Sequence, residues 1–227
     1  MRYDVVLTDL DGTLFDFLAS SRECLKKTFA AFSLPFPEEN IPRFFAINES
    51  LWSAYAQGKI PRDEIYTARF RRYFSEFGII GVSEEAINAH YMGLLRFSVY
   101  CMPRAKELLQ TLTEDGCEIY AVTNGEEAVQ RQRIADSGLA PYFRKVYISG
   151  AVGTQKPERA FFDAVFSEIG EEKRSRAVIF GDSLVSDMQG GRNAGIATCL
   201  YRRMDEPDER CDHAVDDLMD FVSVCRG

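Results

Sequence analysis

Residues 3–14 read YDVVLTDLDGTL, a short apolar run that closes in two acidic residues two positions apart. The run over residues 3–8 is short and rich in valine, which is typical of a strand buried on both faces of a parallel sheet. Ligands of open α/β sheets bind at the carboxyl ends of the strands. We therefore expect the side chains of Asp9 and Asp11 at the binding edge of such a sheet.

Four further runs of this kind follow at residues 118–123, 145–149, 177–181 and 196–201. Helical patterns lie between them. One begins near Pro103 and ends at Gly116, and two more cover residues 126–137 and 158–169, each stopped by a glycine. This alternation predicts an α/β fold with a doubly wound parallel sheet and right-handed crossovers.

Residues 18–100 break the alternation, because they contain no convincing strand and show four amphipathic helical patterns. The first pattern opens at Ser20, with Glu23 three residues later, as in a capping box. The stripe of the second pattern consists of Ile41, Phe45, Trp52 and Tyr55. An all-helical insertion after the first strand is most simply a separate domain. We expect a core of residues 1–17 and 101–227 and a helical cap domain of residues 18–100.

Composition and net charge limit the kinds of partner that the chain can bind. The chain has 227 residues, of which 46% are hydrophobic, so a buried core is expected, and its net charge is −8. An acidic chain repels a phosphate backbone unless a local basic patch compensates, and the longest basic clusters are Arg71-Arg72 and Arg202-Arg203. We expect no nucleic-acid partner.

The cysteines and the apolar segments indicate the compartment. Six cysteines are scattered without C-x-x-C spacing, which argues against a zinc knuckle or a redox pair and favours reduced thiols. Asp4 and Asp9 interrupt the apolar run near the N-terminus, and no segment approaches the roughly 18 apolar residues of a membrane span. We expect a cytoplasmic protein without a membrane partner, either a monomer or a homodimer.

Asp9 and Asp11 carry the strongest chemical signal. One carboxylate can attack phosphorus while the other moves a proton, and Gly12 lets the chain turn sharply between them and the following residues. A solvated acidic turn is the ordinary alternative. It explains two acids alone better than it explains two acids that follow a buried strand and precede Gly-Thr-Leu.

Polar residues also follow the later predicted strands. Thr123 and Asn124 offer a hydroxyl and amides for a phosphate oxygen, and Lys156 can neutralise a phosphoryl group. Asp182 and Asp187 offer the hard oxygen ligands that suit Mg²⁺. Each has an ordinary alternative: a turn, a surface lysine, a helix N-cap. Together they match what phosphoryl transfer requires, which is positioning and neutralisation of charge.

These motifs resemble the haloacid dehalogenase-like superfamily, and the likeness spans nearly the whole chain. The matching stretches are Asp9-Leu-Asp11-Gly-Thr-Leu, Thr123-Asn124-Gly125, Lys156-Pro157 and Gly181-Asp182-xxxx-Asp187. The resemblance implies a Rossmann-like core with a helical cap inserted after the first motif. It also implies an aspartyl-phosphate intermediate and Mg²⁺ held by Asp9, the backbone carbonyl of Asp11 and Asp182.

By the same resemblance, Thr123 and Lys156 bind phosphate, and Asp187 supports either the metal site or Lys156. Dehalogenases of this superfamily usually lack an acid two residues after the nucleophile. The presence of Asp11 therefore favours phosphoryl transfer, in which a leaving oxygen must be protonated.

A finer likeness lies in the predicted cap. The run Ile47-Asn48-Glu49-Ser50-Leu51-Trp52-xx-Tyr55-xx-Gly58-x-Ile60, with Arg69-Phe70 beyond it, is similar to bacterial pyrimidine 5′-nucleotidases. Asn48 stands in an apolar stripe and must find a hydrogen-bond partner, either the edge of a base or a neighbouring helix end. Arg69 either meets substrate or lays its stem on apolar surface.

The sequence thus predicts a Mg²⁺-dependent phosphatase of a small phosphomonoester, with a pyrimidine nucleoside 5′-monophosphate as the first candidate substrate. Two alternatives stay open. One is a phosphatase or phosphomutase acting on phosphoglycolate or a sugar phosphate. The other is an inactive binding protein of the same family, against which the intact set of acidic residues and lysine argues.

Overall fold

The computed structural model describes residues 1–201 and 210–227, so the basic pair Arg202-Arg203 lies outside the described residues. Contacts divide the chain into two compact units. One is formed by Met1–Phe17 together with Val99–Gly227, and the other by Leu18–Ser98. The first contains the sheet and the second is entirely helical. Among the described residues, no helix has both the length and the apolar character that crossing a membrane requires.

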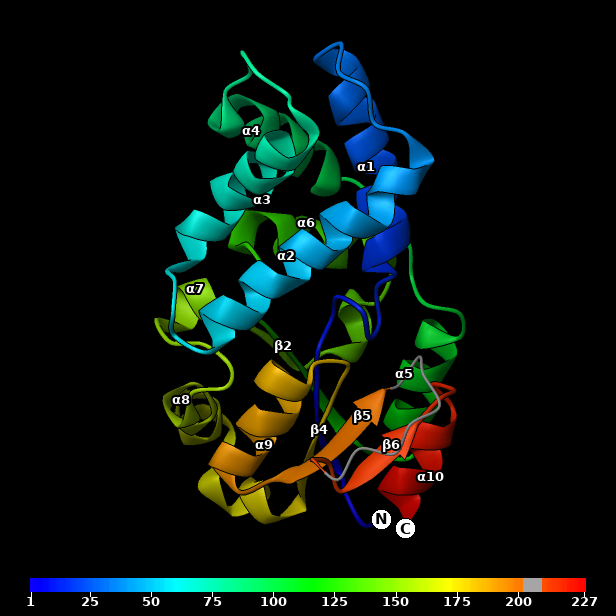
Figure 1. The fold of residues 1–227 in the computed structure, drawn as a ribbon. Coiled ribbons are helices and arrows are strands. Elements are labelled where there is room, and N and C mark those ends of the chain that lie inside the picture. Colours follow the sequence, from blue (N-terminus) through cyan, green and yellow to red (C-terminus); the bar gives the residue numbers. More distant parts are fainter. Residues whose placement is uncertain (202–209) are drawn as a thin grey trace. The chain divides into compact units, whose positions relative to one another are not determined.

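The first unit is built on one twisted sheet (Figure 1). Its strands are β1 (Val5–Thr8), β2 (Glu118–Thr123), β3 (Lys145–Ile148), β4 (Ala177–Gly181), β5 (Ala197–Tyr201) and β6 (His213–Val215). They lie in the order β3-β2-β1-β4-β5-β6, and every pairing among the described strands is parallel. The predicted doubly wound α/β fold is confirmed. The sequence analysis missed β6, because its three residues lie in a polar stretch without an apolar run.

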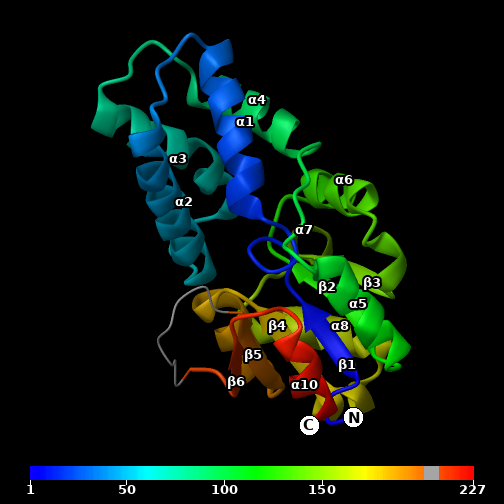
Figure 2. The same cartoon turned by 90° about the vertical axis from the view of Figure 1, so that its right-hand side faces the viewer.

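Helices cover both faces of this sheet (Figures 1 and 2). They are α5 (Ala105–Glu114), α6 (Glu127–Ser137), α7 (Ser149–Val152), α8 (Arg159–Ile169), α9 (Gln189–Ala194) and α10 (Asp220–Arg226). Short 3-10 turns occur at Ala140–Tyr142 and Glu171–Arg176, and a π-helical turn at Leu184–Met188. The predicted positions of α5, α6 and α8 agree with the structure to within about two residues at each end.

Alternate strand residues feed two separate apolar clusters, because successive side chains of a strand point to opposite faces. Val6 and Phe180 pack with α5 and α10 on one face. Val5 and Leu7 pack with the phenylalanines of α8 on the other. The central strands are therefore buried on both sides, which is why their sequences read as continuous apolar runs.

The two chain segments that connect the units run side by side within the first unit. Phe15 forms an isolated antiparallel bridge with Cys101, and the N–H of Asp16 donates to the carbonyl of Tyr100 at 2.7 Å. The chain thus leaves the sheet unit and returns to it through one short two-stranded ribbon.

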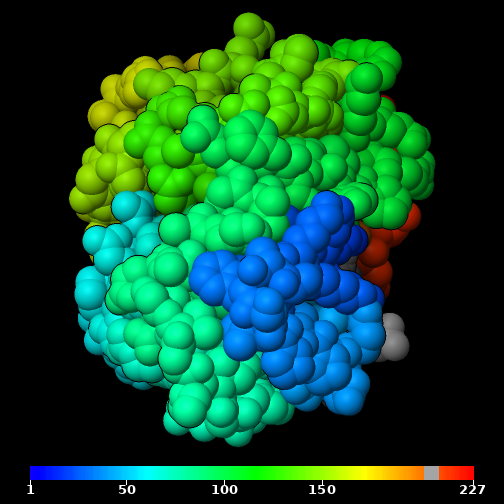
Figure 3. All heavy atoms as spheres, turned by 90° about the horizontal axis from the view of Figure 1, so that it is seen from above, coloured from blue at the N-terminus to red at the C-terminus, as the bar shows by residue number. Residues whose placement is uncertain are grey.

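The second unit consists of α1 (Phe17–Ala31), α2 (Ile41–Ala56), α3 (Arg62–Phe77) and α4 (Glu84–Leu95), with a 3-10 turn at Glu38–Asn40. In Figure 3 the side chains of α1, in blue, lie directly beside those of the green-cyan segment that contains α4. Two hydrogen bonds join these helices: Ser21 Oγ to Tyr91 Oη at 2.8 Å, and Thr28 Oγ1 to His90 Nδ1 at 3.1 Å.

Two details of the helical prediction are wrong. Helix α1 begins at Phe17, and Ser20 is a fully buried residue inside it instead of an N-cap. Packing against neighbouring helices has overridden the local capping signal. In α2, Phe44 and Leu51 are buried whereas Phe45 and Trp52 are half-buried, because Phe44 contacts the aromatic rings of α3.

The interior of the helical unit predicts a large difference between two isoleucines. Ile87 in α4 is fully buried, and Ile80, in the loop before it, is 89% exposed. Ile87→Ala should lower the free energy of unfolding by about 2–5 kcal/mol because it leaves a cavity. Ile80→Ala, the same chemical change, should alter it by less than about 0.5 kcal/mol. Urea denaturation measures both, and equal losses would contradict the packing described above.

Candidate active site

The loop after β1 begins the site. The N–H of Asp9 donates to the carbonyl of Phe180 in β4 at 2.8 Å, which extends the sheet pairing one residue beyond β1. Gly12 turns the chain with a φ of +90°, in the left-handed region that favours glycine. A Cβ at Gly12 would lie 2.0 Å from Oδ2 of Asp182. Glycine therefore allows the loop after β1 to pass directly beside the residue that follows β4.

Lys156 is the centre of the buried charges. Its side chain is 1% exposed, and its ammonium donates to Oδ1 of Asp9 at 2.7 Å, to Oδ1 of Asp187 at 2.6 Å and to the carbonyl of Val122 at 2.8 Å. All three donors of the protonated lysine are thus used. Burial alone would lower the pKa of Lys156, but the carboxylates of Asp187 and Asp9 outweigh it and raise the pKa above the usual value.

Asp187 is fully buried in the π-helical turn after β4. Its Oδ2 accepts a hydrogen bond from the N–H of Ser183 at 3.1 Å while its Oδ1 binds Lys156. A Cβ at Gly181 would lie 2.3 Å from Oδ2 of Asp187, so the glycine makes room for this carboxylate. Asp187 thus contacts Lys156 directly, and both of its predicted roles, support of Lys156 and support of the metal site, stay predictions.

The carboxyl groups of the site outnumber its cation. Burial raises the pKa of Asp9 well above its usual value, against the opposing effect of Lys156, and the charges of Asp187 and Asp182 raise it further. The protein atoms crowded around Asp182, whose side chain still reaches solvent, raise its pKa to about 7, with a further contribution from Asp187. Lys156 alone therefore does not offset the negative charge of Asp9, Asp182 and Asp187.

A divalent cation would neutralise part of the negative charge of these carboxylates. Asp9, Asp182 and Asp187 each offer a ligand atom, and these atoms all lie within 4.8 Å of one another. Carboxylate oxygens are the ligands that Mg²⁺ prefers, usually one or two of them together with water and substrate phosphate. The predicted metal ligands Asp9 and Asp182 are thus brought together, with Asp187 as a third acid beside them. The backbone carbonyl of Asp11 stays a predicted ligand.

The end of β2 supplies the polar residues Thr123 and Asn124. The side-chain amide of Asn124 donates to the carbonyl of Lys156 at 2.8 Å and accepts from the N–H of Lys156 at 3.0 Å. This reciprocal pair fastens the lysine loop to the neighbouring strand end. This pair uses one of the two N–H donors of the Asn124 amide, and the binding of phosphate by Asn124 stays a prediction. Thr123 is buried, and its Oγ1 accepts from the N–H of Gly125 at 3.0 Å.

The other two predicted site residues lie in the helical unit. Arg69 is 2% exposed, and its Nη1 donates to Oδ1 of Asn48, which is also buried, at 3.4 Å. Its Nη2 donates to Oδ1 of Asn88 at 2.5 Å, and the guanidinium lies over the ring of Tyr91 at 4.6 Å. Asn48 and Arg69 thus belong to one buried polar cluster, and their contact with substrate stays a prediction.

The family follows from a comparison of the whole sequence. The model for haloacid dehalogenase-like hydrolases matches residues 3–195. The chain belongs to this family. Because the match includes the loop after β1, the lysine loop and the acids after β4, the family and the clustered side chains point to the same site.

The relatives of this haloacid dehalogenase-like hydrolase include two pyrimidine 5′-nucleotidases. Pyrimidine 5′-nucleotidase PynA of Streptococcus pneumoniae is 36% identical over 205 residues, which cover 88% of this chain and 84% of PynA. Pyrimidine 5′-nucleotidase YjjG of Escherichia coli is 32% identical over 199 residues, 88% of this chain and 86% of YjjG. The predicted resemblance to the family and to its bacterial pyrimidine nucleotidases is confirmed.

A solved structure extends the similarity to three dimensions. The magnesium-bound crystal structure of the HAD-hydrolase YfnB of Bacillus subtilis superposes with a TM-score of 0.92 at 29% identity, and the alignment covers 100% of both chains. The fold class, including the inserted helical cap, is therefore shared by a solved member of the family.

The sequence analysis missed two residues of this hydrolase that contact Asp11. Nε2 of Gln130 and Nη1 of Arg133, both in α6, each lie 2.5 Å from one of the two carboxylate oxygens of Asp11. Gln130 is 1% exposed and Arg133 is fully buried. Their three-residue spacing on the helix was available in the sequence, but polar residues in such a pattern are ordinarily assigned to the solvent face.

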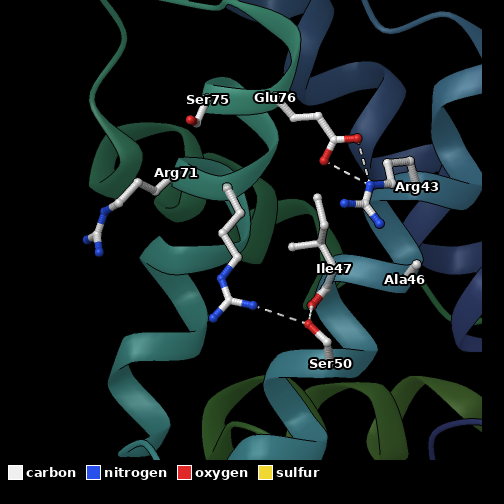
Figure 4. A pocket seen from close by; sticks show the side chains of 8 residues that line it. Arg43, Ala46, Ile47, Ser50, Arg71, Ser75 and Glu76 are labelled. Carbon is white, nitrogen blue, oxygen red and sulfur yellow. Dashed lines mark hydrogen bonds and ion pairs between the residues drawn. The ribbon is translucent and has the colours of Figure 1, made fainter.

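A second feature beyond the prediction is an open groove of about 510 Å³ between α2 and α3 (Figure 4). Arg43, Ala46, Ile47, Ser50, Arg71, Arg72, Ser75 and Glu76 line it. Nε of Arg43 donates to both carboxylate oxygens of Glu76, at 2.7 and 2.8 Å, and the side chains of Arg43 and Arg71 are 53% and 55% exposed. Water can hydrate the charges of Arg43 and Arg71. The exposure of these two arginines is therefore weaker evidence for a ligand than the burial of Arg69.

The ion pairs of Lys156 predict a strong dependence of stability on this residue. Lys156→Met leaves two carboxylates buried without their cation, so we expect the free energy of unfolding in metal-free buffer to fall by about 3–5 kcal/mol. Lys145→Met removes a half-exposed pair with Glu168 and should cost about 0–1 kcal/mol. Urea denaturation compares the two, and equal small effects would show that the buried ammonium contributes little.

Proposed function

We propose that this chain is a Mg²⁺-dependent phosphomonoester hydrolase that forms an aspartyl-phosphate on Asp9. The observation that carries the proposal is the close assembly of Asp9 with Lys156, Asp182 and Asp187 at the carboxyl edge of the sheet. A carboxylate beside a fixed cation and further metal-binding acids can approach a phosphate dianion, which would otherwise repel it.

In the first half of the reaction, a carboxylate oxygen of Asp9 attacks phosphorus and the bond from phosphorus to the ester oxygen breaks. Asp11 donates its proton to the departing oxygen, so that an alcohol leaves instead of an alkoxide. Lys156 and Thr123 bind the oxygens of the transferred phosphoryl group. A Mg²⁺ bound by Asp9, Asp182 and the Asp11 carbonyl would neutralise charge on these phosphoryl oxygens.

In the second half, Asp11 accepts a proton from a water molecule, which attacks the phosphorus of the aspartyl-phosphate. The bond between phosphorus and the Asp9 oxygen breaks and inorganic phosphate leaves. Asp11 is then protonated again and ready for the next substrate. The same side chain thus serves as acid and as base, which requires it to hold its position through both steps.

The substrate class that we propose is a pyrimidine nucleoside 5′-monophosphate. Relatives named pyrimidine 5′-nucleotidase, at 32% and 36% identity over most of the chain, support it. The cluster around Arg69 supports it independently. In the described parts of the chain no carboxylate pairs with Arg69, and its Nε, which is buried, has no hydrogen-bond partner. Asn48 and Arg69 offer donors that suit the carbonyl oxygens of a pyrimidine.

The hydrolase proposal predicts a simple loss of activity. The wild-type protein should hydrolyse p-nitrophenyl phosphate with Mg²⁺ present, and chelation by EDTA should abolish turnover. Asp9→Asn should reduce kcat by at least about 10³-fold, because the neutral amide cannot form the acyl phosphate. The absorbance of the released p-nitrophenolate measures the rates. A wild-type protein that turns over no phosphomonoester would leave a binding protein as the better description.

The nucleotide proposal predicts a selective effect of the buried arginine. Arg69→Met should raise KM for UMP by about tenfold or more, because one good hydrogen bond to a buried charge is worth about 1.5–3 kcal/mol. The kcat/KM for p-nitrophenyl phosphate, which has no base, should change less than about threefold. Arg71→Met, at a half-exposed position of the same helix, is the matched control. A metabolite screen with turnover of phosphoglycolate or sugar phosphates, and none of UMP, dUMP or dTMP, would reject the nucleotide class.

A further inference from the structure

Asp11 is held by two side chains of α6, a helix that carries none of the family motifs quoted above. Nη1 of Arg133 donates to Oδ1 of Asp11 and Nε2 of Gln130 donates to Oδ2, each at 2.5 Å. Each oxygen of the carboxylate therefore has its own donor. Two donors from one rigid helix define both the position of the carboxyl group and the rotation of its plane.

The burial of the three side chains is unequal. The side chain of Arg133 is 0% exposed, that of Asp11 is 28% exposed, and Gln130 is buried. The donors thus lie beneath the carboxylate, which keeps one side open to solvent. A fully buried arginine is costly unless it is paired, and Arg133 forms an ion pair with Asp11.

Further contacts hold the two donors in place. The guanidinium of Arg133 lies over the ring of Phe15 at 4.8 Å, a cation–π contact that restricts its rotation. Gln130 also reaches Oγ1 of Thr123 at 3.3 Å. A Cβ at Gly125 would lie 2.3 Å from Nε2 of Gln130, so the glycine after Asn124 leaves the space in which Gln130 can reach Asp11.

We propose that Gln130 and Arg133 are positioning residues that keep Asp11 oriented for both of its proton transfers. Neither residue touches the phosphoryl group in this assignment, and each acts through Asp11. The inference rests on the proposed function, in which Asp11 is the acid and base of a phosphatase. It adds two residues that the sequence motifs of the family do not include.

Substrates with different leaving groups distinguish a loss of Asp11 positioning from a general loss of active-site structure. p-Nitrophenolate is a stable anion and leaves with little need for a proton. The alcohol oxygens that leave from UMP and 2-phosphoglycolate are strongly basic and must be protonated as they leave. kcat/KM reports the steps up to loss of the leaving group, so slow hydrolysis of the aspartyl-phosphate does not enter it. Arg133→Met and Gln130→Leu should each lower kcat/KM for the alkyl phosphates at least about tenfold more than for p-nitrophenyl phosphate.

Two controls come from the same helix. Arg131 is exposed and pairs with Glu127, and Gln132 is half-buried and donates to Asp136. Arg131→Met and Gln132→Leu should change no kcat/KM by more than about twofold. Arg133→Lys should recover part of the loss, because it returns a cation to the site.

A double-mutant cycle tests whether the effect passes through Asp11. In an Asp11→Asn background, Arg133→Met should produce almost no further loss for the alkyl phosphates, since the group that it positions is already gone. Equal losses for both substrate types, or losses that multiply in the double mutant, would overturn the inference. Because Arg133→Met removes a buried partner, its folding is checked by circular dichroism. Gln130→Leu gives an independent answer if that variant does not fold.

Failure of the proposed function gives a different result. In that case the wild-type protein hydrolyses neither p-nitrophenyl phosphate nor the alkyl phosphates, and the assignment of Gln130 and Arg133 falls with it. Normal wild-type turnover combined with an unselective effect of the variants rejects the positioning role alone.

Discussion

One buried ammonium group pairs with two buried carboxylates at the carboxyl edge of the sheet. Lys156 binds Asp9 and Asp187 at 2.7 and 2.6 Å and uses its third donor on the carbonyl of Val122. Removal of Lys156 would leave both carboxylates in the interior without their cation, whereas removal of one carboxylate would still leave an ion pair with the other. The arrangement therefore constrains three chain segments at once: the loop after β1, the lysine loop, and the turn after β4.

Small residues make this crowding possible. Gly12 lies against Asp182, Gly181 against Asp187, and Gly125 against Gln130, each with a carboxylate or amide where a Cβ would stand. The glycines that follow or precede the charged residues in the sequence motifs are thus explained by the side chains that lie beside them in space. They allow four strand ends to bring their polar groups within reach of one another.

The sequence predicted the parts of the structure that depend on local pattern. The central strands are buried on both faces, so they read as apolar runs, and the charged residues that follow them lie together because parallel strands end at one edge. It did not predict features that depend on contacts between distant parts of the chain. Ser20 has the local signature of a helix cap but is buried within α1. Gln130 and Arg133 were missed because nothing in the local sequence reveals that Asp11 lies beside α6.

The ribbon formed by Phe15 and Cys101, with the bond from Asp16 to Tyr100, places the exit and the return of the chain next to each other. An insertion at such a place disturbs the sheet little if the two ends of the inserted segment lie close together. This is the condition under which domain insertions are tolerated. The helical unit can therefore be lengthened, shortened or exchanged in the course of evolution while the strands and their catalytic edge stay unchanged. Such modularity would let one chemistry acquire new substrates through the inserted segment alone.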